Sequence, residues 1–79
     1  MKRQTYAIAS EILYAALSGV QKTRLQYSCN LGQEMCNKYI SSLLGNGLLE
    51  KRYKEFYTTK KGIKFIETFQ KLEDLWKIT

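Results

Sequence analysis

Apolar residues in the first part of the chain recur every three or four positions. From about Thr5 to Ser18 this spacing predicts an amphipathic helix, because residues three and four apart lie on one face. Its apolar stripe consists of Ile8, Ile12, Leu13, Ala15, Ala16 and Leu17. Gly19 is expected to end the helix. Val20 and Gln21 are too few for an independent strand, and we expect them at most to pair at the edge of a sheet.

Two further helices are predicted around a tight turn. The first is short and runs from Lys22 to Cys29, with Leu25 and Cys29 facing inward. Asn30-Leu31-Gly32 breaks it, because Asn and Gly accept left-handed or capping conformations that most residues resist. The next helix runs from about Gln33 to Gly45. Its buried stripe is Cys36, Ile40, Leu43 and Leu44, and its polar face consists of Gln33, Glu34, Asn37, Lys38 and Ser41.

An extended pattern follows this helix. Asn46-Gly47 supplies the left-handed residue that often terminates a helix. Leu48–Tyr53 and Phe56–Thr59 then predict two strands around a turn at Tyr53-Lys54-Glu55. The chain is therefore expected to be mainly α-helical with a small β-hairpin.

The final helix is predicted to begin after the N-cap Thr59 and to reach about Ile78. Gly62 in its first turn lowers helix propensity by about 1 kcal/mol, so we expect it to allow a close contact instead. Phe65, Phe69, Leu72 and Trp76 are spaced by four, three and four residues, which suits a short coiled coil with a second copy of the chain. The predicted dimer interface consists of Phe69, Leu72, Leu75 and Trp76. The alternative is that this helix folds back entirely onto its own core.

The composition is that of one small globular domain. The chain has 79 residues, of which 44% are hydrophobic and 25% charged. A domain of this size buries a modest fraction of its surface, so a second subunit would stabilise it. No apolar run approaches transmembrane length, and Met1-Lys2-Arg3 is not followed by the apolar segment of a signal peptide. We therefore expect a cytoplasmic protein without a membrane partner.

The charge and the residue types narrow the function. A net charge of +6 suits a polyanion, either nucleic acid or an acidic membrane face, unless it is simply a Lys-rich solvated surface. The chain has no His, and Cys29 and Cys36 do not form a CxxC pair, so we interpret both as reduced thiols in the core. It also has no convincing carboxylate pair and no Gly-rich phosphate loop. No enzyme, metal, cofactor or small-molecule ligand is predicted.

The predicted order of helix, short helix, turn, helix, hairpin and helix is that of a winged helix-turn-helix. On particular residues the chain resembles the small archaeal winged-helix DNA-binding proteins that dimerise through an antiparallel coiled coil of their C-terminal helices. The matching segments are Ile8/Ile12, Gly19-Val20-Gln21-Lys22-Thr23, Asn30-Leu31-Gly32, Tyr39-Ile40-x-x-Leu43-Leu44-x-Asn46-Gly47-Leu48-Leu49-Glu50 and Tyr57-Thr58-Thr59-Lys60-Lys61-Gly62-x-x-Phe65.

The resemblance implies a winged helix-turn-helix domain over residues 1–59 and a dimerisation helix over residues 60–79. It also implies that a homodimer binds double-stranded DNA. The sequence departs from the family in two places. Gly32 stands where such proteins usually have Ser or Thr to cap the recognition helix, which predicts a weaker cap. The last helix is short for a long coiled coil, which predicts a compact dimer.

The third helix is predicted to enter the major groove. Gln33 and Asn37 are one helical turn apart, and we interpret them as lying opposite the buried stripe. Their amide groups suit the paired donor and acceptor contacts of adenine. Lys38 and Ser41 would reach a phosphate or a base edge. Glu34 faces partly the same way and would repel phosphate, unless it accepts a hydrogen bond from cytosine.

Basic residues outside this helix are expected to contact the DNA backbone. Lys51, Arg52 and Lys54 on the hairpin would lie along the backbone or reach the minor groove. The start of the second helix would bind a phosphate through its N-terminus, with Lys22, Thr23 and Arg24. Lys2 and Arg3 would form a short basic arm. Of the six tyrosines, Tyr53 at the wing is the one for which base stacking stays open.

Two alternatives stay open beside a DNA-binding role. Many winged helices dock proteins without touching DNA, and others hold duplex RNA. If the target is DNA, the role is that of a transcription regulator or of a nucleoid-associated, chromatin-type protein. The basic hairpin favours nucleic acid, because a protein-docking winged helix does not need three cations there.

Overall fold

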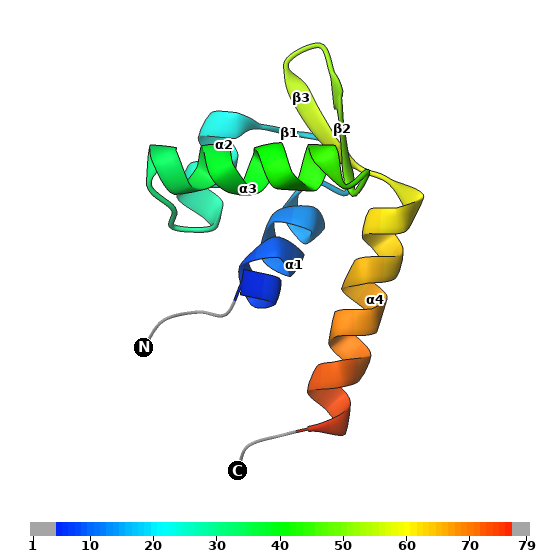
Figure 1. Ribbon diagram of the computed structural model, residues 1–79. Helices are drawn as coiled ribbons and strands as arrows, with labels where there is room; N and C mark the ends of the chain where they lie inside the picture. The colour runs from blue at the N-terminus through cyan, green and yellow to red at the C-terminus, as the bar shows by residue number, and fades with distance from the viewer. Residues whose placement is uncertain (1–4, 77–79) are drawn as a thin grey trace.

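The computed structural model describes residues 5–76, and Figure 1 shows how its elements are arranged. In chain order they are α1 (Thr5–Ala15), β1 (Val20–Gln21), α2 (Lys22–Ser28), α3 (Gln33–Gly45), β2 (Leu49–Arg52), β3 (Glu55–Thr58) and α4 (Lys60–Leu75). The bounds predicted for the third helix are confirmed, and the second helix ends one residue earlier than predicted. Lys2, Arg3 and the predicted end at Ile78 lie outside the described residues.

The first helix is shorter than predicted, because it ends at Ala15 and not at Ser18. After Ala15 the chain tightens into a turn, in which Leu17 N–H donates to the Tyr14 carbonyl (3.3 Å) and Gly19 N–H to the Ala16 carbonyl (3.2 Å). Leu17 therefore leaves the apolar stripe and is exposed, contrary to its predicted place in that stripe.

The predicted hairpin is part of a three-stranded antiparallel sheet with the order β1-β3-β2. Val20 pairs with Phe56, so the expected edge pairing of this short segment is confirmed. Arg52 pairs with Glu55, which leaves a turn of only Tyr53 and Lys54. The predicted three-residue turn is thus too long, and Glu55 belongs to the strand.

Left-handed residues end two helices as the sequence indicates. Asn30 has φ 53° after α2, and Gly47 has φ 74° after α3. In each case the next N–H reaches back to the helix: Leu31 to the Gln26 carbonyl and Leu48 to the Leu43 carbonyl, both at 2.9 Å. This six-to-one hydrogen bond is that of the Schellman motif, and it fixes the direction in which the chain leaves each helix.

The core lies where α1, α2, α3 and the sheet meet. Its buried side chains include both cysteines, which are reduced thiols as predicted. The buried set is Ala9, Ile12, Leu13, Ala16, Val20, Leu25, Cys29, Cys36, Ile40, Leu43, Leu49 and Phe56. The first half of α4 adds Phe65 and Ile66, which are partly buried against this core.

The start of α4 is fixed to the rest of the fold by a cluster of hydrogen bonds. Thr59 Oγ1 accepts from Gly62 N–H (3.1 Å), which confirms the predicted N-cap, and the same hydroxyl donates to the Gly47 carbonyl (2.7 Å). Gly62 is buried, and a Cβ there would overlap the Leu48 carbonyl oxygen. The expected close contact at this glycine is therefore confirmed. From this point α4 runs alongside α1 (Figure 1).

Candidate nucleic-acid interface

The polar residues of α3 form one exposed surface. Gln33, Glu34, Asn37, Lys38 and Ser41 are all exposed, as predicted for this helix. Gly32 precedes them in an extended conformation without a side-chain cap. The first-turn N–H groups of α3 therefore receive no capping side chain from this residue.

Gln33 and Asn37 do not lie opposite the buried stripe, contrary to the prediction. With 3.6 residues per turn, they fall on the same row as the buried Ile40 and the half-buried Leu44. They are exposed because they stand at the edge of the stripe near the start of the helix. One-turn spacing places two residues on a common row of a helix but does not fix which face that row occupies.

Ser41 and Glu34 occupy the middle of the exposed surface, and Lys38 its other edge. Lys38 borders a groove between α3, α1 and α4, whose apolar walls include Met35, Tyr39 and Phe65. Lys38 is thus separated from Gln33 and Asn37 by about one third of the helix circumference, because successive residues of a helix are rotated by about 100°. A nucleic acid on this surface would meet amides on one side and a single cation on the other.

The start of α2 lies beside the N-terminal half of α3 (Figure 1). Thr23 and Arg24 are exposed and Lys22 is half-buried. Burial raises the pKa of the Cys36 thiol, and the positive charge of Lys22 opposes part of that increase. Lys22 therefore acts electrostatically on the first turns of α3, whereas Thr23 and Arg24 face solvent.

The cations of the wing, the β2–β3 hairpin, do not share one face. Side chains alternate along a strand, so the neighbours Lys51 and Arg52 project to opposite sides of the sheet. Lys51 pairs with the buried Phe56, and its Nζ lies 5.7 Å from the centroid of that ring. Arg52 is on the outer side, where its guanidinium lies 4.9 Å from the centroid of the Tyr57 ring. Lys54 is exposed at the tip.

Arg52 belongs to a network on the outer side of the wing. Its Nη2 forms an ion pair with Glu50 Oε1, and the Tyr57 hydroxyl donates to Glu55 Oε1 at 3.1 Å. The hydrogen bond to Glu55, together with the negative charge of that carboxylate, raises the pKa of Tyr57, while Arg52 lowers it to a smaller extent. Because Glu50 and Glu55 stand among the hairpin cations, the sequence predicts surface ion pairing there, and for Glu50 this pairing is confirmed. The alternation of strand residues places Glu50 with Arg52 and Glu55 with Tyr57.

The remaining lysines near the wing have different surroundings. Lys61 Nζ donates to the Asn46 carbonyl (2.8 Å), so it stabilises the C-terminal end of α3. Lys60 and Lys64 are exposed on α4. Lys60 and Lys64 thus lie on a solvated face of α4, whereas Lys61 is tied to the end of α3.

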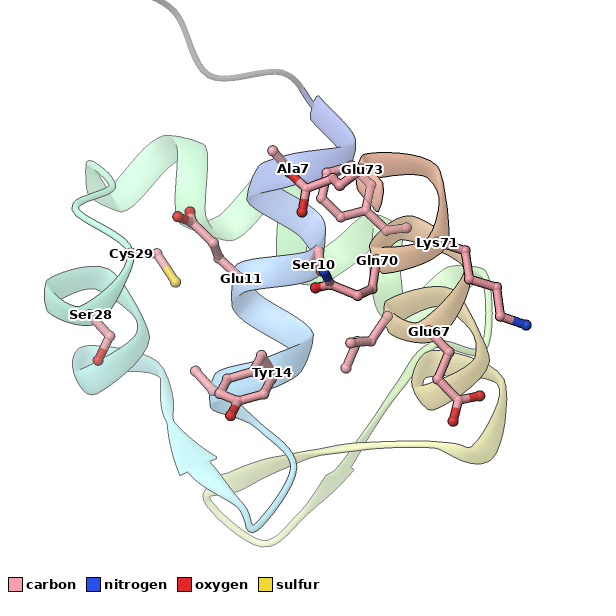
Figure 2. A pocket seen from close by; sticks show the side chains of 13 residues that line it. Ala7, Ser10, Glu11, Tyr14, Ser28, Cys29, Glu67, Gln70, Lys71 and Glu73 are labelled. Carbon is pink, nitrogen blue, oxygen red and sulfur yellow. The ribbon is translucent and has the colours of Figure 1, made fainter. Parts of the chain in front are cut away.

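A second groove lies between α1 and α4 (Figure 2). Figure 2 shows Ser10, Glu11 and Tyr14 on the α1 side and Gln70 on the α4 side, with Cys29 on the wall formed by the end of α2. It shares no residue with the predicted DNA-contacting set. Within residues 5–76, no group of three or more His, Cys, Asp and Glu side chains is placed to hold a metal ion.

The comparison with protein families decides the identity of the fold. The model of a winged helix-turn-helix family matches residues 2–77. The chain belongs to this winged helix-turn-helix family. No curated protein matches the chain. Membership points to DNA binding in general, and winged helix-turn-helix domains are typically not catalytic.

In this winged helix the residues of the predicted dimer interface are largely exposed. Leu72, Leu75 and Trp76 have exposed fractions of 58%, 84% and 79%, whereas Phe69 is half-buried. They border a shallow groove whose opposite wall is formed by Tyr6 and Ala7 of α1. Across residues 5–76, no helix of the winged helix has the length and apolar character needed to cross a membrane.

Proposed function

We propose that the protein binds double-stranded DNA as a homodimer, with α3 in the major groove and the wing along the backbone or in the minor groove. The observation that carries this proposal is the arrangement of the exposed polar surface of α3. α2, whose start carries the exposed Arg24, packs against α3, and the wing, which carries the exposed Lys51 and Lys54, follows the C-terminal end of α3 (Figure 1). Such an arrangement suits phosphates on both sides of one groove.

Base contacts in this proposal come from the exposed side of α3. Gln33 and Asn37 present amides that match the N6 and N7 positions of adenine. Ser41, which lies between these amides and Lys38 on the helix surface, reaches a base edge. Glu34 near the middle of the surface disfavours phosphate and favours the N4 amino group of cytosine. α3 would therefore read bases and contribute few phosphate contacts.

Phosphate contacts come from the flanking elements. Thr23 and Arg24 are exposed at the start of α2, and Lys51 and Lys54 are exposed on the wing. Lys22 is half-buried and contributes mainly at longer range. Arg52 contributes less than the two wing lysines, because Glu50 already offsets its charge. The wing thus supplies two strong backbone contacts and one weak one.

The homodimer would form through the second half of α4. The exposed apolar side chains of Leu72, Leu75 and Trp76 have no covering element among the described residues, and burying them would remove a large apolar surface from water. Phe69 would line the base of this contact. A dimer would present two copies of α3 to one duplex, as in other helix-turn-helix proteins.

The role that fits these features is that of a transcription regulator or a chromatin-type protein, with a cytoplasmic, nucleoid-associated location. The second candidate is a winged helix that docks another protein and does not bind DNA. The exposed stripe on α4 and the internal neutralisation of Arg52 favour that candidate. Duplex RNA is the alternative nucleic-acid target.

The test is a titration of a labelled duplex DNA and of the same sequence as duplex RNA at several salt concentrations. The variants are Lys51→Ala/Lys54→Ala and, as a matched control with the same loss of charge, Lys64→Ala/Lys71→Ala on α4. The proposal expects salt-dependent binding to duplex DNA that the wing variant weakens more than the control does. Equal weakening of DNA binding by both variants would mean that only the net charge of the protein matters. If wild type does not bind duplex DNA at low salt, the protein-docking role becomes the preferred one. Tighter binding to duplex RNA than to duplex DNA would assign the same surface to RNA.

A further inference from the structure

Tyr53 at the tip of the wing has an unusual backbone conformation. Its φ is 57°, the left-handed region, at the first position of a two-residue turn. That position ordinarily holds Gly, Asn or Asp, because a bulky side chain is disfavoured there. Among residues 5–76 the other non-glycine residue with positive φ is Asn30, a residue type that tolerates it. Within residues 5–76, Tyr53 is therefore the bulky residue that adopts this strained backbone conformation.

The ring of Tyr53 is not stabilised by packing against the rest of the fold. Its exposed fraction is 98%, the highest among the exposed large apolar side chains of the described residues. Tyr6, by comparison, packs edge-to-face on Phe65 with the ring centroids 6.2 Å apart. Strain without an internal contact is typical of positions where a side chain serves a ligand.

The surroundings of Tyr53 define the chemistry of that ligand. Lys54 follows it at the tip, and Lys51 and Arg52 stand on the two sides of the strand that leads to it. The tip projects away from the helices (Figure 1). A flat, exposed aromatic ring followed directly by the exposed Lys54 suits a nucleobase stacked on the ring, with a phosphate of its strand beside the cation.

We infer that Tyr53 stacks on an unpaired base, so that the protein prefers duplexes containing an unpaired base to fully paired ones. This inference rests on the proposed binding of duplex DNA, which brings the wing against the backbone. An unpaired base is favoured over a paired one because its extrusion from the stack costs the least free energy. The ring is rigid, with two side-chain torsions, so little conformational entropy is lost on stacking.

The test compares three labelled duplexes at one salt concentration. One is fully paired, one carries a single bulged 2-aminopurine, and one carries an abasic bulge, which has the same flexibility but no base to stack. Wild type is expected to bind the base bulge at least about fivefold more tightly than either other duplex, the lower end of what one aromatic stack contributes. The fluorescence of 2-aminopurine should fall on binding, because stacking quenches it.

Two variants separate the ring from the backbone. Tyr53→Phe keeps the ring and should keep both the preference and the quenching. Tyr53→Gly suits the left-handed turn, so it should fold and bind the paired duplex, but without preference or quenching. A preference that persists in Tyr53→Gly, or equal binding to the abasic bulge, would overturn the inference.

The outcomes also distinguish this inference from the proposed function. Binding of wild type to the paired duplex, without preference for the base bulge, overturns the stacking role alone. Absence of binding to all three duplexes overturns both. Tyr27→Ala, which removes a ring with an exposed fraction of 83% from α2, is the control for nonspecific aromatic contact and should leave the preference unchanged.

Discussion

Gly19 lies directly against the ring of Tyr57, and a Cβ at Gly19 would come within 2.6 Å of the ring atoms Cε2 and Cζ. Gly19 also has φ 95°, a conformation that side-chain-bearing residues rarely adopt. This contact joins the turn after α1 to β3, and the Arg52 guanidinium lies over the same Tyr57 ring. The position of the Tyr57 ring in the outer network of the wing therefore depends on the absence of a side chain at Gly19.

Replacement of Gly19 by Ala should destabilise the protein by about 2 kcal/mol or more, because the new Cβ combines backbone strain with overlap of the Tyr57 ring. Urea unfolding monitored by circular dichroism measures the change. Gly45→Ala is the matched control, since a Cβ there meets nothing within 4 Å. That variant should gain up to about 1 kcal/mol from improved helix propensity. Equal effects of the two variants would show that the contact with Tyr57 has no energetic importance.

A side-chain cap on the recognition helix should stabilise it. Gly32 is the N-cap of α3, has extended backbone angles and has open space around it. Gly32→Ser should raise stability by a few tenths of a kcal/mol, because the hydroxyl accepts a hydrogen bond from an N–H of the first turn. Gly32→Ala offers no acceptor and should not stabilise the protein. Thermal unfolding of the two variants gives the comparison, and a gain with Ala as large as with Ser would contradict the capping explanation.

The wing lysines and Arg52 should differ in the salt dependence of DNA binding. Lys54→Ala should lower the slope of log K against log salt concentration by about one, because one phosphate contact is lost. Arg52→Ala should lower it by less, since Glu50 and the Tyr57 ring already engage the guanidinium. Fluorescence anisotropy at four or more salt concentrations measures the slopes. A larger loss for Arg52 than for Lys54 would mean that the outer network opens on binding.

The oligomeric state should depend on the end of α4. Leu72→Asp/Trp76→Asp places two charges in the proposed interface and should convert a dimer to a monomer in sedimentation velocity. Tyr27→Asp alters an exposed aromatic residue of α2 and should leave the dimer intact. A wild-type protein that sediments as a monomer at high micromolar concentration would contradict the proposed homodimer.

Stability should decline at alkaline pH, partly through Cys36. Burial raises the pKa of this thiol in the folded protein, so the folded state holds the proton more tightly than the unfolded state does. The resulting stabilisation is present below the ordinary thiol pKa of about 8.5 and is lost as pH rises through the raised value. Urea unfolding at pH 7, 9 and 10 should show the decline. Cys36→Ala should reduce it, and an unchanged pH dependence would exclude the thiol as a contributor.

Local patterns of the sequence predicted those parts of the fold that local physics decides. The span of α3 follows from its apolar period and from Gly47, and the Schellman hydrogen bond of Leu48 appears where that glycine places it. The N-cap at Thr59 and the close contact at Gly62 were likewise predictable, because cap chemistry and the absence of a side chain act over a few residues.

The features that escaped prediction depend on register or on distant partners. A two-residue turn with a tyrosine at positive φ runs against turn preferences, so the residue types favour the longer turn. The ion pair of Arg52 and its contact with Tyr57 depend on which strand residues face outward, and that register was open in the sequence. Whether Gln33 and Asn37 contact bases stays a prediction, since the fold establishes only that both are exposed.

The hydrogen bonds around Thr59 and Lys61 have a consequence for how two half-sites on DNA would be spaced. The Thr59 hydroxyl donates to the Gly47 carbonyl, the Thr59 N–H donates to the Leu48 carbonyl, and Lys61 Nζ donates to the Asn46 carbonyl. The end of α3 and the start of α4 are therefore joined without a flexible linker. In a dimer formed through α4, the two copies of α3 would therefore be held at a fixed distance from each other. Inserting or deleting base pairs between half-sites would then be penalised by the protein's stiffness as well as by the helical phase of the DNA.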